Sequence, residues 1–120
     1  TFSMSQKFLW QILELEMAKV YIVQAHNNKD MSDAKRHGEL HVLYPNHIHR
    51  PYDTDYLTTV AHTQLRDFCE DDFLLLLGDP AICGMVTKVA SEYSETVRML
   101  SWNRIKQEYH EVAWDFADAD

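Results

Sequence analysis

The alternation of apolar and polar residues predicts two strands near the start of the chain. Residues 20–23 form a run of β-branched and aromatic side chains without helical spacing, which is typical of a strand. Residues 39–44 alternate in polarity and predict a second strand. The polar residues 25–38 between them are therefore expected to form a long loop.

Two helices and a buried strand are predicted in the middle of the chain. Apolar side chains share one helical face over residues 57–68, and Asp53 precedes them as an N-cap. Residues 73–77 are apolar at every position, which favours a central strand covered on both faces. Asp79 and Pro80 then provide the expected cap and first position of a second helix.

The last part of the chain predicts an antiparallel hairpin, with strands over residues 97–102 and 108–114. The preceding strand–helix–strand order implies right-handed crossovers and parallel pairing. The sequence therefore predicts the α/β class: a single small open mixed sheet, mainly parallel, with an antiparallel C-terminal hairpin edge and helices packed on the sheet. Residues 17–120 are expected to form one domain, since 120 residues is an ordinary domain size.

Residues 1–16 differ in pattern from the rest. Ser3 and Gln6 have the spacing of a capping box, and the apolar residues that follow recur at helical spacing. Two interpretations stay open. Either these residues are an N-terminal extension, with Met17 as the natural start, or they form a helix that packs on the domain or on a partner.

Composition and charge narrow the classes of partner. The chain has 11 Lys and Arg against 19 Asp and Glu, a net charge of −8, which argues against direct nucleic-acid binding. The apolar run over residues 73–77 is far shorter than the roughly 20 residues of a membrane helix. Two cysteines without regular spacing exclude a disulfide scaffold. We expect a soluble, cytoplasmic protein with no membrane partner.

The turn after the predicted central strand is the first candidate site. Gly78, Asp79 and Ala81 lie where a strand ends and a helix begins, and open α/β sheets bind ligands there. Free backbone N–H groups at a helix start favour an anion. However, the turn lacks the glycines of a nucleotide-binding loop, and Asp79 would repel a phosphate. A structural role as a helix cap therefore competes with ligand binding.

Histidines form the second candidate site, because five of the seven fall within residues 37–62. His47 and His49 would share one face of an extended segment. With His62 from the following helix, they predict a three-histidine site for zinc or another divalent metal. The competing interpretation is that they are solvent-exposed, since their spacing matches no established metal signature. No other cofactor is expected.

Two further groups of reactive side chains have structural interpretations. Cys69 or Cys83 beside a histidine would act as a nucleophile, and a helix start would lower the pKa of Cys83. Burial as structural cysteines is the interpretation that we favour. The acidic residues 70–72 are interpreted as a solvated face. No residue is assigned a catalytic role.

Aromatic side chains on the terminal hairpin predict an interface. Trp102, Tyr109 and Trp114 lie on its two strands, and edge strands associate unless they are protected. These side chains either pack on the helices as part of the core or form an apolar edge through which two copies of the chain associate.

Several short segments of the chain together resemble those of a known protein family. They are residues 72–80, Gly84 within the next helix, residues 100–104 and residues 109–112. With them the chain resembles small uncharacterised α/β proteins of tailed bacteriophages, over Met17 to Phe116. The resemblance implies a phage or environmental viral origin, a location in the cytoplasm of the host cell and a mixed α/β fold. It transfers no catalytic residues.

Three function classes follow. The first is a non-enzymatic phage accessory protein that binds a host or phage protein, or itself as a homodimer, and whose acidic face mimics nucleic acid at a basic groove. The second is a small-ligand or nucleotide-binding protein or enzyme that uses the Gly78–Asp79 turn. The third is a metal-binding protein that uses the histidine cluster. Acidic charge, small size and the lack of a catalytic signature favour the first.

Overall fold

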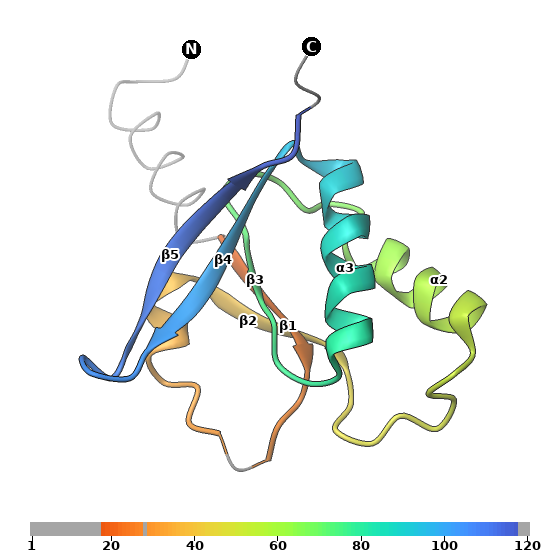
Figure 1. Cartoon of the computed structure of the whole chain (residues 1–120), viewed down its shortest axis with the longest axis horizontal. Helices are drawn as coiled ribbons and strands as arrows, with labels where there is room; N and C mark the ends of the chain where they lie inside the picture. The colour runs from red at the N-terminus through yellow and green to blue at the C-terminus, as the bar shows by residue number, and fades with distance from the viewer. Residues whose placement is uncertain (1–17, 28, 118–120) are drawn as a thin grey trace, which may run out of the picture.

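A computed structural model describes residues 18–27 and 29–117 (Figure 1). Its strands are β1 (Lys19–Gln24), β2 (Glu39–Tyr44), β3 (Phe73–Leu75), β4 (Thr96–Asn103) and β5 (Glu108–Asp115). Its helices are the 3-10 helix η1 (Ala34–His37) and the α-helices α2 (Thr54–Gln64) and α3 (Pro80–Tyr93). The predicted extension over residues 1–16 lies outside the described residues. Within the described ranges, no helix has the length and apolar character needed to cross a membrane.

The five strands form one open sheet in the order β2-β1-β3-β4-β5. β1 pairs in parallel with β2 and β3, and β3 pairs in parallel with β4. β4 and β5 pair antiparallel, with Thr96 opposite Asp115 at one end and Asn103 opposite Glu108 at the other. This arrangement confirms the predicted fold, a mainly parallel mixed sheet with the C-terminal hairpin at its edge.

The two faces of the sheet are covered differently (Figure 1). α2 and α3 pack on one face, where their apolar residues join those of the strands in a cluster that includes Leu74 and Val86. The opposite face carries a second cluster, which includes Tyr109 and is covered by Ala34 of η1. The segment expected to be a long loop therefore contains the short helix η1, which packs on this face of the sheet through Ala34.

Two predicted elements are shorter than expected. β3 ends at Leu75, because the N–H of Leu77 turns back to donate to the carbonyl oxygen of Leu75, and Leu76 is exposed. α2 ends at Gln64, although Leu65 just beyond it is buried in the core. Apolar burial thus continues past the last helical residue of α2, whereas the residue that follows β3 is exposed.

Asp72 corrects the expectation that residues 70–72 form a solvated acidic face. It is only 3% exposed. Its two carboxylate oxygens accept hydrogen bonds from the backbone N–H groups of Lys19, at 3.0 Å, and Cys69, at 3.1 Å. The carboxylate thereby joins the first residue of β1 to the turn that precedes β3. The two acidic residues before it are exposed, as expected.

Gly38 lets η1 pass directly into β2. A Cβ atom at this position would lie 2.5 Å from the carbonyl oxygen of Ala18, just before β1. The N–H of Glu39 donates to the same oxygen at 2.9 Å. The absence of a side chain at residue 38 therefore allows the beginnings of β1 and β2 to approach and pair.

Candidate functional site

The β4–β5 hairpin carries the three aromatic residues predicted as an interface. Tyr109 is 2% exposed, and the centroid of its ring lies 4.8 Å from that of Trp102. Trp102 is 38% exposed. Trp114 is 51% exposed and lies opposite Val97, on the face of the sheet that the helices cover. Tyr109 therefore belongs to the core, whereas the two tryptophans are accessible on different faces of the hairpin.

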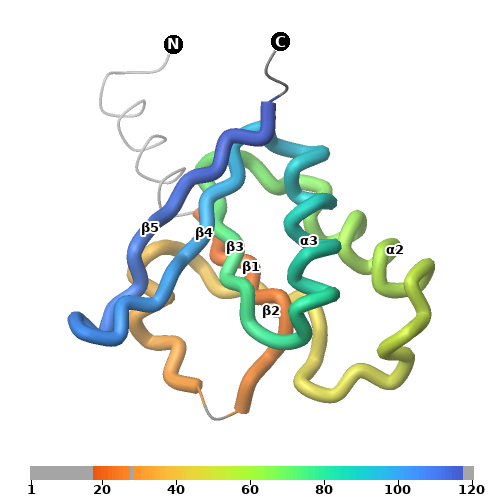
Figure 2. Tube along the Cα trace, in the orientation of Figure 1, coloured from red at the N-terminus to blue at the C-terminus, as the bar shows by residue number. Residues whose placement is uncertain are grey.

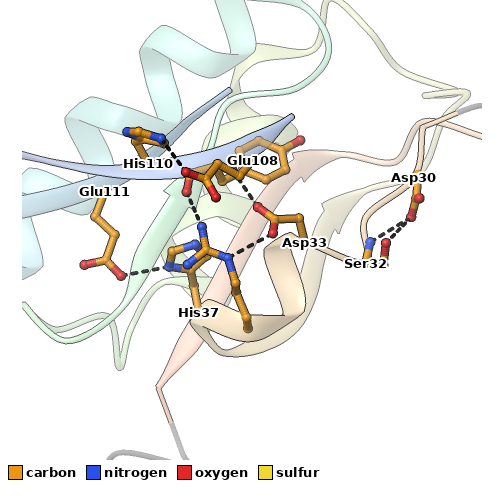
Figure 3. Close-up of polar contacts among 9 residues, drawn as sticks. Asp30, Ser32, Asp33, His37, Glu108, His110 and Glu111 are labelled. Carbon is orange, nitrogen blue, oxygen red and sulfur yellow. Dashed lines mark hydrogen bonds and ion pairs between the residues drawn. The ribbon is translucent and has the colours of Figure 1, made fainter. Parts of the chain in front are cut away.

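Two charged side chains hold the backbone of Tyr109 (Figure 3). Its N–H donates to Asp33 Oδ2 at 2.6 Å, and its carbonyl oxygen accepts from Arg36 Nη2 at 2.6 Å. Arg36 Nε in turn donates to Asp33 Oδ1 at 2.9 Å. Asp33 is the N-cap residue of η1, and Arg36 lies within it. This single helical turn thus offers Tyr109 an acceptor and a donor, as a neighbouring strand would. We call this arrangement the Tyr109 clamp.

His37, the last residue of η1, makes a further contact between this helix and β5. Its side chain is 5% exposed, and its Nδ1 lies 2.8 Å from Glu111 Oε2. Figure 3 shows the His37 ring pointing toward the Glu111 carboxylate. Because a carboxylate only accepts, Nδ1 is the nitrogen that carries the hydrogen in this pair. The other ring nitrogen, Nε2, is buried without a hydrogen-bond partner among the described residues.

The clamp changes the acidity of its members. The hydrogen bond from the Tyr109 N–H lowers the pKa of Asp33, and the hydrogen bond from Arg36 lowers it further. The same contact with Asp33 raises the pKa of Arg36. Since the pKa of Asp33 falls below its ordinary value of 3.8 on folding, the charged clamp contributes to stability above that pH. The contribution is lost as the pH falls through the lowered pKa.

β5 is an edge strand, and only part of its outer side is occupied. Tyr109 directs its N–H and C=O groups away from β4 and into the clamp. Every second residue along an antiparallel strand points its backbone groups in the same direction, so Glu111, Ala113 and Asp115 do likewise. No strand in the described part of the chain pairs with these groups. We call them the open edge of β5.

The Gly78–Asp79 turn follows β3, as predicted, and Figure 2 shows the ends of β1 and β3 beside the start of α3. Its backbone donors are used within the chain. Asp79 N–H donates to Gln24 Oε1 at 3.0 Å, and the Asp79 carboxylate accepts from the N–H groups of Ala81 and Ile82. Gly78 has a left-handed φ of 105°, and a Cβ there would collide with the Gln24 side chain. An anion would therefore find none of these three N–H groups free.

Asp79 and Ala81 do line a cavity of about 250 Å³ between the starts of α2 and α3. Leu57, Ile82 and Met85 form its apolar wall. The cavity lies near the carboxyl ends of the parallel strands, where open α/β sheets bind ligands. Its wall suits a small apolar molecule better than a phosphate.

The three histidines predicted as a metal site are not gathered. The rings of His47 and His49 are neighbours, with centroids 5.4 Å apart. His62 instead has its Nδ1 2.8 Å from the hydroxyl of Tyr93 and its Nε2 3.7 Å from the Glu92 carboxylate. Over residues 18–27 and 29–117, no group of three or more His, Cys, Asp or Glu side chains is placed to hold a metal ion. The contacts of His62 join α2 to α3.

The two cysteines are free, with Cys69 exposed and Cys83 buried. The Sγ of Cys69 lies 3.5 Å from Asp72 Oδ2, and that of Cys83 lies 3.7 Å from the carbonyl oxygen of Leu77. Desolvation raises the pKa of both thiols. The pKa of Cys83 is therefore raised by burial and by the charge of Asp79, where the helix start was expected to lower it. Both environments favour the thiol over the nucleophilic thiolate.

The sequence pattern does not reveal the Tyr109 clamp. Asp33 and Arg36 have the i, i+3 spacing of an ion pair within one helical turn, which is the one local signal. Their partner lies 76 residues from Asp33, on the strand predicted over residues 108–114.

Comparison with known protein families gives a match for the chain. Residues 18–116, which span β1 to β5, match the family described as Phage Pam3 gp32-like protein. This range nearly coincides with the Met17 to Phe116 expected from the resemblance to phage proteins, which is confirmed. Searches of curated proteins and of solved structures find no match. From β1 to the end of the terminal hairpin, then, the chain is a phage-type protein, and it belongs to the Phage Pam3 gp32-like protein family.

Proposed function

We propose that this phage protein is a non-enzymatic accessory protein that binds a partner protein by adding a strand of the partner to the open edge of β5. The row of outward backbone groups at Glu111, Ala113 and Asp115 carries the proposal. An extended segment pairs with such an edge through main-chain hydrogen bonds, and its alternate side chains supply specificity.

The Tyr109 clamp limits where the added strand begins. Asp33 and Arg36 already use the outward N–H and C=O of Tyr109, so pairing starts at Glu111. Toward the other end, Trp114 and Phe116 are 51% and 45% exposed and offer apolar contacts. The proposed binding site therefore covers residues 111–116.

The charge of β5 favours a basic partner over a second copy of the chain. Glu108, Glu111 and Asp115 lie on this strand, and the whole chain has a net charge of −8. Two copies of β5 side by side would bring these carboxylates together, and like charges across strands are destabilising. A strand in which Lys or Arg alternates with apolar residues would complement both the carboxylates and Trp114.

A proline at position 113 tests this mode of binding. Ala113→Pro removes an outward N–H group and leaves the inward groups of Val112 and Trp114 paired with β4, so the hairpin is expected to fold. From a lysate of infected cells, the wild type should retain a stoichiometric phage or host protein that Ala113→Pro does not retain. Ala113→Val keeps the N–H group and the strand propensity, and it should bind like the wild type.

NMR spectra of the purified chain give a second measurement of the same binding mode. A synthetic peptide in which lysine alternates with valine should shift the amide signals of Glu111, Ala113 and Asp115. A peptide with glutamate in place of lysine should leave them unchanged, because it repels the acidic edge. Equal retention of the partner by the wild type and Ala113→Pro would contradict the proposal, as would a stable homodimer formed through β5.

A second candidate function is small-ligand binding in the cavity of about 250 Å³ beside Asp79 and Ala81. A ligand present at 100 times its Kd adds about 2.7 kcal/mol to the stability of the folded state, which a thermal-shift screen detects. We expect small apolar molecules to raise the Tm and nucleotides to leave it unchanged. Ala81→Leu, which fills the cavity, should remove the effect. A screen without any stabilising molecule would count against this candidate.

A further inference from the structure

A larger cavity lies between the segment before η1 and the tip of the β4–β5 hairpin. Its volume is about 440 Å³, which is within the range of pockets that enclose small organic ligands. Its wall combines two parts of the chain that are far apart in sequence. Lys29, Asp30 and Ser32 come from the first part, and Trp102, Gln107 and Tyr109 come from the second.

The hydroxyl of Tyr109 is the feature that most needs explanation in this cavity. Tyr109 is 2% exposed, and its hydroxyl is buried without a hydrogen-bond partner among the described residues. Tyr109 lines the cavity, and buried polar groups are nearly always paired, so its unpartnered hydroxyl points to a bound molecule that supplies the partner. Desolvation raises the pKa of Tyr109, so the hydroxyl keeps its hydrogen and both donates and accepts.

The other polar groups of the cavity include donors and acceptors. Lys29 brings ammonium donors. Asp30 Oδ1 accepts from the N–H and the hydroxyl of Ser32, as Figure 3 shows, and its second oxygen is left for a ligand. The side-chain NH2 of Gln107 donates to the carbonyl oxygen of Arg104, which leaves its amide oxygen as an acceptor.

The balance of charge in the cavity favours an uncharged ligand. Lys29 and Asp30, which both line the cavity, carry opposite charges. Asp33, which also lines the cavity, is paired with Arg36 in the Tyr109 clamp. An anion would meet the carboxylates, and a cation would meet Lys29.

Trp102 gives the cavity an aromatic wall. It is 38% exposed, and its ring meets that of Tyr109 edge-on, at 63° and 4.8 Å between centroids. This contact packs the indole against Tyr109, another residue of the cavity wall. The cavity therefore combines a rigid aromatic surface with hydrogen-bonding groups of both kinds.

We propose that this cavity binds a neutral saccharide of one or two rings. The C–H groups on the face of a sugar ring pack on an aromatic side chain, and its hydroxyls both donate and accept. This chemistry matches an indole wall next to Asp30, Lys29 and an unpartnered tyrosine hydroxyl at low net charge. The site lies apart from the open edge of β5 and does not depend on the proposed function.

Titration of the full chain with neutral sugars tests the proposal. Glucose, galactose, N-acetylglucosamine, maltose and lactose are the probes, at up to about 10 mM, which covers millimolar affinities. At least one of them should bind, with shifts in the NMR signals of Ser32 and the Trp102 indole. Trp102→Ala should weaken that binding by about tenfold or more. Ile105 is an exposed apolar residue between β4 and β5 that does not line the cavity, so Ile105→Ala should leave the binding unchanged.

Tyr109→Phe separates a binding role from a structural one. It keeps the ring and its packing on Trp102 and removes only the unpartnered hydroxyl, so the chain should fold at wild-type stability or better. Affinity for the sugar should fall several-fold. The proposal is overturned if none of the five sugars binds, if binding survives both Trp102→Ala and Tyr109→Phe, or if nucleosides bind in place of sugars.

Discussion

Replacing Asp72 with alanine is expected to lower the free energy of unfolding by about 3 kcal/mol. The carboxylate is buried and accepts hydrogen bonds from the backbone N–H groups of Lys19 and Cys69. Hydrogen bonds to a charged group contribute roughly 1.5–3 kcal/mol each, and alanine leaves both donors without their acceptor. Urea unfolding followed by circular dichroism measures the loss.

Two variants control for this result. Asp72→Asn keeps one acceptor oxygen in place and should lose about half as much stability as the alanine variant. Asp71→Ala changes an exposed neighbour and should stay within about 0.5 kcal/mol of the wild type. If Asp72→Ala were no more destabilising than Asp71→Ala, the buried carboxylate would not be what joins β1 to the turn before β3.

Replacing Gly38 with alanine is expected to cost about 2 kcal/mol of stability. The new Cβ would lie 2.5 Å from the carbonyl oxygen of Ala18, and that oxygen belongs to the backbone, which cannot rotate away as a side chain does. To avoid this clash, the beginnings of β1 and β2 must separate, which weakens the hydrogen bond from the Glu39 N–H to the carbonyl oxygen of Ala18. Overpacking of this kind typically costs about 1–3 kcal/mol. Thermal unfolding of the purified variant provides the measurement.

Gly84→Ala is the matched control, because it makes the same chemical change within α3. A Cβ at Gly84 meets no atom within 4 Å. Since alanine favours a helix over glycine, this variant should gain about 0.5–1 kcal/mol. The two substitutions are therefore expected to have opposite signs. A shared sign would mean that the close approach at residue 38 does not restrict the side chain there.

The sequence pattern predicts the fold well because neighbouring residues carry most of the signal. The apolar run that begins at Phe73 predicts a strand covered on both faces, and all three residues of β3 are buried. Asp79 and Pro80 predict the start of α3, and the Asp79 side chain does cap it. The order of the strands in the sheet cannot be predicted in the same way. It depends on which strands meet in space, and no local pattern specifies that β1 lies between β2 and β3.

The candidate sites are predicted less well because they depend on distant partners. The clustering of His47, His49 and His62 in the sequence suggests a metal site, yet His62 contacts Tyr93, 31 residues away. Asp72 looks solvated among its acidic neighbours, but its partner Lys19 lies 53 residues away. Local charge patterns indicate exposure on average and carry no information about a donor that another element brings to the same place.

The length of chain enclosed by the Tyr109 clamp has a consequence for the order of folding. The clamp joins residues 76 positions apart, whereas the β4–β5 hairpin closes over a short turn. Loop-closure entropy grows with the length enclosed, so we expect the clamp to form after the hairpin and to open before it. When the clamp opens, Asp33 and Arg36 no longer contact β5, and we expect a protease to cut near η1 while the helical side of the sheet stays folded.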